Sequence, residues 1–159
     1  MTLSFTPVPL TLQQMIVLLG GAALGARLGM LSQVLYLAAG VAGLHVFAAS
    51  PLLPPGAARL LGPTAGYLWS YPLAAFVTGA LAQRGFDRRY ATAVVAMAAG
   101  LGVIFGGGVL WLAAAARSVD AALGAGFWPF VLADLVKLLV AAAILPAAWR
   151  LIGSSARQG

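Results

Sequence analysis

The sequence contains no cysteine, a single histidine and only three acidic residues among 159. Without cysteine the chain can form neither a disulfide bond nor a thiolate metal site. The histidine, His45, has no second histidine or carboxylate near it in the sequence, so we expect no metal site there. Residues 62–66 (GPTAG) superficially resemble a phosphate-binding loop but lack the lysine and the spacing of a Walker A motif. The sequence therefore predicts a protein that is not an enzyme, holds no metal or cofactor and hydrolyses no ATP by itself.

Charged residues are also scarce: they make up 8% of the chain, whereas 62% of its residues are hydrophobic. Soluble domains typically contain about 25% charged residues. The net charge of +6 comes from basic residues that are scattered at the ends of apolar segments, so nucleic acid is not an expected partner. With a mean hydropathy of +1.00, the chain is predicted to be an integral membrane protein in which residues 1–159 form a single transmembrane domain within a lipid bilayer.

Five apolar segments meet the length of about 17–25 residues that a membrane-spanning helix needs. They cover residues 10–26, 28–47, 63–83, 90–116 and 129–149. Pro51, Pro54 and Pro55 exclude a continuous helix between the second and third segments. Consecutive glycines at 106–108 lead us to expect a kink or break in the fourth segment. The predicted fold class is an all-α integral membrane protein, a compact bundle of five to six transmembrane helices.

Glycines spaced four residues apart indicate where helices pack closely. The spacing joins Gly21 to Gly25, Gly25 to Gly29 and Gly102 to Gly106. Because glycine has no side chain, helix backbones can approach one another at such positions. We therefore expect a tight bundle.

The distribution of arginine predicts how the helices are oriented. One side of the membrane collects Arg27, Arg84, Arg88, Arg89, Arg150 and Arg157, whereas the other side holds only Arg59 and Arg117. Under the positive-inside rule, the arginine-rich side is cytoplasmic. We expect a multi-pass protein of the cell (plasma) membrane, with its N-terminus outside and its C-terminus in the cytoplasm.

Asp134 and Lys137 are the only acid and the only ammonium placed well inside an apolar segment. A charged side chain at the bilayer centre costs about 2.5–3.5 kcal/mol on insertion scales, so such residues usually face a cavity or a partner. Their i, i+3 spacing places both on one helix face, where they can reach a shared ligand or each other. The pair is thus either a binding site for a small polar solute or an intrahelical ion pair.

Four further residues are candidates for the same pocket. Thr64 and Tyr67 begin the third apolar segment, Gln13 lies in the first and Phe47 ends the second. Each has another interpretation: Tyr67 as an ordinary interfacial tyrosine, Gln13 as a helix cap or a solvated side chain, and Phe47 as a core or lid aromatic residue.

Short motifs follow one another along most of the chain: VPLTLQ at 8–13, LGARLG at 24–29, YLAAG at 36–40, GPTAGYL at 62–68, PF at 129–130 and DLVK at 134–137. In order and spacing they resemble the BioY family, the substrate-capture (S) components of energy-coupling-factor (ECF) biotin transporters. The similarity extends from about residue 8 to residue 148.

The resemblance implies capture of biotin in a pocket that opens to the outside. It also implies docking on a transmembrane coupling subunit and a pair of ATPase subunits, which supply the energy. Asp134 would accept a hydrogen bond from a ureido N–H, and Lys137 would donate one to a biotin oxygen. The expected substrate-binding residues are Asp134, Lys137, Tyr67, Thr64, Gly66, Gln13 and Phe47.

The chain departs from the family pattern in three places. Family members usually have another helix before the first motif, but only seven residues precede Val8, so we expect that N-terminal helix to be missing or very short. A proline-rich segment at 49–55 replaces a glycine-rich loop, and His45 stands where a proline is usual. Two alternatives follow: capture of another water-soluble vitamin, and a non-transporting structural role in a membrane complex.

Overall fold

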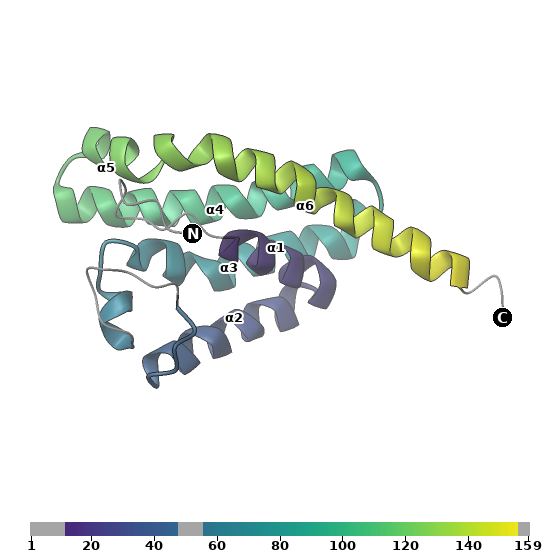
Figure 1. Ribbon diagram of the computed structural model, residues 1–159, viewed down its shortest axis with the longest axis horizontal. Coiled ribbons are helices and arrows are strands. Elements are labelled where there is room, and N and C mark those ends of the chain that lie inside the picture. The colour runs from purple at the N-terminus through teal and green to yellow at the C-terminus, as the bar shows by residue number, and fades with distance from the viewer. Residues whose placement is uncertain (1–11, 48–55, 156–159) are drawn as a thin grey trace.

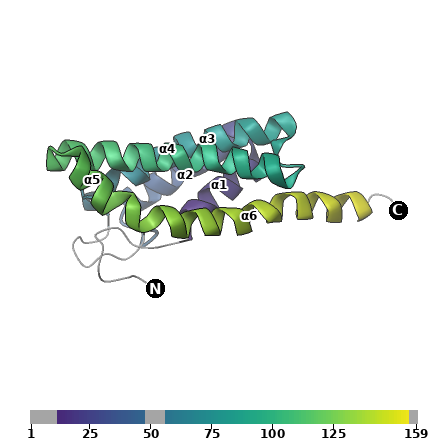
Figure 2. The same ribbon diagram turned by 90° about the horizontal axis from the view of Figure 1, so that it is seen from above.

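The structure, a computed structural model, describes residues 12–47 and 56–155 and contains only helices within these ranges. The α-helices are α1 (Gln13–Leu24), α2 (Ala26–Val41), α3 (Ala65–Leu81), α4 (Tyr90–Ala116), α5 (Val119–Gly126) and α6 (Trp128–Ser155). In Figures 1 and 2, α4 and α6 form the long axis of the molecule, and α3 lies beside α4 and contacts both α1 and α2. The all-α bundle expected from the sequence is confirmed.

Within the described residues, two helices are long and apolar enough to cross a membrane on their own. They cover Tyr90–Ala116 and Trp128–Arg150, each with a mean hydropathy of 2.2. The helices α1 and α2 have 12 and 16 residues, which is shorter than we expected for the first two spans. At 1.5 Å per residue they extend roughly 18 and 24 Å, less than the hydrocarbon core of about 30 Å. The third helix, α3, has 17 residues and continues directly into a π-helical turn at Ala82–Phe86, so the third expected span is helical over most of its length.

Glycine explains where the shorter helices end. Gly25 separates α1 from α2 with φ of 83°, and Gly43 takes φ of 94° just after α2. Such left-handed backbone conformations are readily adopted only by glycine. The second expected span therefore stops at Val41 rather than at residue 47.

The glycine run at 106–108 does not break α4, so the expected kink is wrong. The helix is continuous from Tyr90 to Ala116. A Cβ atom on Gly107 would overlap the hydroxyl of Ser70, and one on Gly108 would overlap the ring of Tyr67. These glycines allow α3 to lie close to α4 and leave the hydrogen-bonding pattern of the helix unchanged.

A second group of glycines brings α1, α2 and α3 together. A Cβ atom on Gly79 would lie 2.6 Å from main-chain atoms of Ala26, Gly21 and Gly25. A Cβ atom on Gly29 would lie 2.8 Å from the Cα atom of Gly21. The spacing of Gly21, Gly25 and Gly29 thus marks a true close contact, as expected.

The pair Gly102 and Gly106 does not follow that expectation. Both residues have open space where a Cβ atom would lie. Both are exposed and line an open groove between α4, α5 and α6, so their spacing does not mark a close helix contact within the described chain.

The outer surface of the bundle is apolar. Large hydrophobic side chains stay exposed on several helices, among them Leu35, Leu110, Leu132 and Val140, which are 68–73% exposed. Soluble monomers rarely expose broad apolar surfaces, whereas lipid tails solvate them without cost. The surface therefore suits a bilayer and agrees with the membrane class predicted from composition.

Substitution of Gly79 by alanine should destabilise the bundle, because the added methyl group meets main-chain atoms that cannot move aside. We expect a loss of about 1–3 kcal/mol, measured as a lower thermal unfolding midpoint in detergent. The matched control is Gly20→Ala in α1, where nothing lies within 4 Å of the new atom. That variant should keep or raise the midpoint, and equal midpoints for both variants would contradict the packing account.

Candidate ligand-binding site

Asp134 and Lys137 contact each other on α6. The ammonium nitrogen of Lys137 lies 2.8 Å from Oδ1 of Asp134, as the i, i+3 spacing allows. The Asp134 side chain is 2% exposed and that of Lys137 is 17% exposed. Of the two alternatives that the sequence left open, the intrahelical ion pair is present. It lies on the face of α6 that points into the bundle.

A third residue, Gln14 on α1, completes the surroundings of the carboxylate. Its side chain is buried and forms a hydrogen bond with Asp134. A buried carboxylate needs such partners, because removing it from water is costly unless it is paired and hydrogen-bonded. Gln14 thus ties the start of α1 to α6.

The neighbouring residue Gln13 points to another helix. Its amide donates a hydrogen bond to the hydroxyl of Tyr36 on α2, which in turn donates to the carbonyl oxygen of Val46 at 3.1 Å. Successive residues of an α-helix point about 100° apart, so the two glutamines reach different neighbours. Gln13 is half-buried, and its bond to Tyr36 links α1 to α2, which favours a hydrogen-bonding role between helices over a fully solvated side chain.

Tyr71 on α3 joins these two groups of residues. Its ring is buried, lies 6.4 Å from the ring of Tyr36, and interacts electrostatically with both Tyr36 and Asp134. The result is one group of polar side chains from four helices, which we call the polar cluster. It consists of Gln13, Gln14, Tyr36, Tyr71, Asp134 and Lys137.

Phe47 packs beside the polar cluster. Its ring meets the ring of Tyr36 edge-on, with 5.4 Å between centroids. It also covers Gly40, where any side chain would overlap the phenyl ring. Phe47 is half-buried. It therefore packs against the cluster from the loop that follows α2.

Tyr67 is buried and holds α3 against α5. Its hydroxyl donates a hydrogen bond to the carbonyl oxygen of Gly126 at 2.6 Å, and its side chain is 4% exposed. It also interacts electrostatically with Asp134. The alternative of an ordinary interfacial tyrosine is wrong, because this hydroxyl bonds to the main chain inside the bundle.

The other two expected residues at the start of α3 have different surroundings. Gly66 lies where α3 crosses α4, and a Cβ atom there would overlap Trp111 and the carbonyl oxygen of Gly107. Thr64 precedes the first turn of α3, is half-buried and makes no side-chain cap hydrogen bond. The structure therefore gives Gly66 a packing role and does not place it in the polar cluster.

His45 and the proline-rich segment were further features of the sequence. His45 is exposed to the surroundings of the protein. Residues 48–55 and the expected N-terminal feature at residues 1–11 lie outside the described residues.

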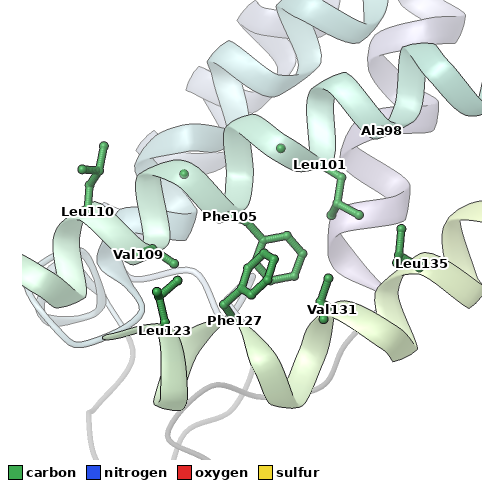
Figure 3. Close-up of a pocket in the computed structure, with 11 residues that line it drawn as sticks. Ala98, Leu101, Phe105, Val109, Leu110, Leu123, Phe127, Val131 and Leu135 are labelled. Atoms are coloured by element: carbon green, nitrogen blue, oxygen red, sulfur yellow. The ribbon is translucent and has the colours of Figure 1, made fainter. Parts of the chain in front are cut away.

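An apolar groove of about 500 Å³ lies between α4, α5 and α6 (Figure 3). The rings of Phe105 and Phe127 meet inside it at 5.2 Å between centroids. The groove is lined by Ala98, Leu101, Gly102, Phe105, Gly106, Val109, Leu110, Leu123, Phe127, Val131 and Leu135. Pockets that fix a small ligand need a few convergent polar groups as well as apolar walls. This groove has no polar side chain, so the polar cluster is the better candidate site.

Three members of the polar cluster, Gln14, Tyr36 and Tyr71, were not predicted. A signal was nevertheless present, because buried tyrosine hydroxyls and glutamine amides need hydrogen-bond partners. Gln14 also adjoins the predicted Gln13. Which of these polar groups meet depends on how the helices pack, and that is not readable from spacing along the chain.

Comparison with known proteins identifies the family of this chain. The model of the BioY family matches residues 1–154. A protein of Thermotoga maritima named "Biotin transporter BioY" is 42% identical over 138 residues, covering 87% of this chain and 79% of the relative. A Pyrococcus horikoshii protein named "Probable biotin transporter BioY" is 41% identical over 145 residues, covering 90% and 82%.

A solved structure shares the fold. It is described as the crystal structure of the S-component for biotin from an ECF-type ABC transporter. The TM-score is 0.79 at 24% identity, and the match covers 94% of this chain and 80% of that one. Taken with the motifs and the helical arrangement, the family match over nearly the whole chain shows that this protein belongs to the BioY family.

Proposed function

We propose that this protein captures biotin within the membrane as the substrate-binding component of an ECF-type transporter. The names of its relatives and of the structure that shares its fold support the proposal. The observation that carries it is the polar cluster, in which a buried carboxylate, an ammonium and the Gln14 amide come together beside the hydrogen-bonded pair of Gln13 and Tyr36.

The chemistry of the cluster suits the polar groups of biotin. A ureido ring offers two N–H donors and one carbonyl acceptor, and the ligand also carries a carboxylate. The carboxylate of Asp134 accepts from an N–H, and Lys137 donates to a biotin oxygen. An ammonium has three donors, so Lys137 can bind the ligand while it keeps its contact with Asp134. Each charge-assisted bond contributes about 1.5–3 kcal/mol.

Aromatic side chains beside the cluster suit the apolar body of the ligand. Tyr36 and Phe47 meet edge-on, and Tyr71 lies next to Tyr36. Tyr67 also interacts electrostatically with Asp134. Apolar walls with a few oriented polar groups are what small-molecule sites generally offer. Thr64 and Gly66 remain proposed contacts from the family resemblance alone.

Energy for uptake comes from other chains on this proposal. The sequence has no Walker A motif, so ATP hydrolysis requires separate ATPase subunits and a transmembrane coupling subunit. The protein binds no cofactor, and biotin is its transported ligand.

The arrangement of arginines supports an orientation with the C-terminus in the cytoplasm. A cleft at one end of the bundle is lined by Gly25, Gln83, Arg88 and Trp149, so the α1–α2 turn, the α3–α4 turn and the later part of α6 meet there. Arg27, Arg84, Arg89 and Arg150 adjoin these segments in sequence. Under the positive-inside rule, this end is cytoplasmic and the plasma membrane contains the bundle.

Removal of either charge should weaken biotin binding. For Asp134→Asn and for Lys137→Met we expect an affinity loss of about 10–100-fold, because each variant loses one charge-assisted hydrogen bond. The measurement is thermal unfolding of detergent-purified protein at increasing biotin, since a ligand that binds only the folded state stabilises it.

Controls for these variants are exposed residues of the same charge. Asp120→Asn on α5 and Arg27→Met on α2 should respond to biotin like the unaltered protein. Normal biotin binding by both Asp134→Asn and Lys137→Met would make the ion pair purely structural. A response to another vitamin instead of biotin would change the ligand, and no response to any vitamin would favour a structural subunit.

Gln14→Leu should also weaken biotin binding, although by less than loss of the carboxylate. The variant removes the hydrogen bond that orients Asp134 and keeps the volume of the side chain similar. We expect about a 3–30-fold loss of affinity, as one hydrogen bond to a charged group is removed. Gln33→Leu on α2, whose amide bonds only weakly to Ser32 at 3.3 Å, is the matched control. Equal affinities for the two variants would exclude Gln14 from the site.

Uptake should depend on ATP hydrolysis by other polypeptides. Vesicles that contain this protein alone should not accumulate radiolabelled biotin above the outside concentration. Accumulation should occur in vesicles that also contain the coupling subunit and both ATPase subunits, when ATP is supplied on the side of the membrane that the ATPase subunits face. Accumulation by this chain without an ATPase would overturn the assignment to an ECF-type system.

A further inference from the structure

A second cleft lies at the arginine-rich end of the bundle, apart from the polar cluster. Its volume is about 290 Å³. It is lined by Ala22, Ala23, Leu24, Gly25, Ala82, Gln83, Gly85, Asp87, Arg88 and Trp149. None of these residues belongs to the polar cluster, so the cleft has no role in the function proposed above.

The single carboxylate in this cleft is already satisfied. Asp87 is 8% exposed, and its Oδ2 atom accepts a hydrogen bond from the indole N–H of Trp149 at 2.5 Å. The Asp87 side chain therefore points toward Trp149 and away from solvent. The hydrogen bond leaves the carboxylate its negative charge, which the arginines of the same segments outnumber.

Arg88 is held in place by the same tryptophan. Its guanidinium carbon lies over the Trp149 ring, 5.4 Å from the centroid. The N–H donors of a guanidinium lie in its plane, so a contact with a ring face leaves their edge directed outward. Arg88 is exposed, and its position over the ring reduces the entropy lost when those donors bind an anion.

Further positive charge adjoins the cleft in sequence. The segments that form it also carry Arg27, Arg84, Arg89 and Arg150, all of them exposed. Asp87 is the only acid in these segments. An anion in the cleft would therefore be attracted by several guanidinium groups, which bind phosphate oxygens in a bidentate manner.

The cleft also has an apolar side that opens toward lipid. Leu24 is 50% exposed and Trp149 is 45% exposed, and Ala22 and Ala23 lie in the preceding turn of α1. Tryptophan is typical of the boundary between lipid tails and headgroups. A free phosphate would use only the arginine side of the cleft, whereas a phospholipid would also place an acyl chain along Leu24.

We propose that this cleft binds the phosphate headgroup of an anionic phospholipid, with Arg88 as the principal contact. Basic pockets between transmembrane helices are known to select anionic headgroups by charge. The lipid would join α1, the α3–α4 turn and the end of α6, and so stabilise the bundle where α6 extends beyond its neighbours (Figure 1). The inference does not depend on biotin as the transported ligand.

The test compares lipids that differ in charge. The full chain in neutral detergent is titrated with phosphatidylglycerol or with phosphatidylcholine, and bound lipid is counted by native mass spectrometry alongside the thermal midpoint. We expect phosphatidylglycerol to bind more tightly and to raise the midpoint more. Arg88→Gln should weaken phosphatidylglycerol binding about tenfold, because one charge-assisted contact is lost, and Arg88→Lys should restore part of it.

Arg117→Gln is the control, because Arg117 is exposed after α4 and is absent from the cleft. It should bind phosphatidylglycerol like the unaltered chain. If Arg88→Gln does not fold, Arg84→Gln serves as the second variant and should also lower phosphatidylglycerol affinity. Equal binding of the two lipids, or unchanged binding by the arginine variants, would overturn the proposal. If inorganic phosphate displaced phosphatidylglycerol with an affinity equal to that of the lipid, the site would be one for a free anion and the proposal would also be overturned.

Discussion

The buried ion pair between Asp134 and Lys137 is the constraint on which the rest of this structure depends. A carboxylate that is 2% exposed in an apolar bundle must be neutralised and hydrogen-bonded, or its burial would oppose folding. Lys137 supplies the charge from the same helix, and Gln14 supplies a further bond from α1. The close contact of α1 with α3 makes this possible, because Gly21 lies against the main chain of Ala75 and so draws α1 into the bundle.

Local spacing in the sequence predicted some of these features well. The ends of α4, the membrane character of α4 and α6, and the proximity of Asp134 to Lys137 all follow from patterns within a single helix. The contact of Gln14 with Asp134 could not be predicted in this way, because it joins helices that are far apart along the chain. The glycines at 106–108 failed as a kink signal for a related reason: a glycine either bends a helix or admits a neighbour, and only the facing residues, here Ser70 and Tyr67, decide which.

The short helix α5 is another feature that hydropathy did not reveal. It occupies Val119–Gly126 between the two long helices, and the Ser118 side chain caps it by accepting from the N–H of Ala121. The hydroxyl of Tyr67 fixes its end through the carbonyl of Gly126. Gly126 lies two residues before α6 begins at Trp128, so this bond also anchors the chain where α6 starts. Replacement of Tyr67 would therefore disturb helix packing whether or not the residue contacts a ligand.

Lys137 has a further property that follows from composition. It is the only lysine in the chain, and 17% of its side chain remains accessible within the bundle. Amine-selective acylation of lysine side chains can consequently occur at a single position, which lies inside the candidate site. Protection of this lysine side chain from the reagent would therefore report directly whether a ligand occupies the candidate site, without an engineered label or any change to the sequence.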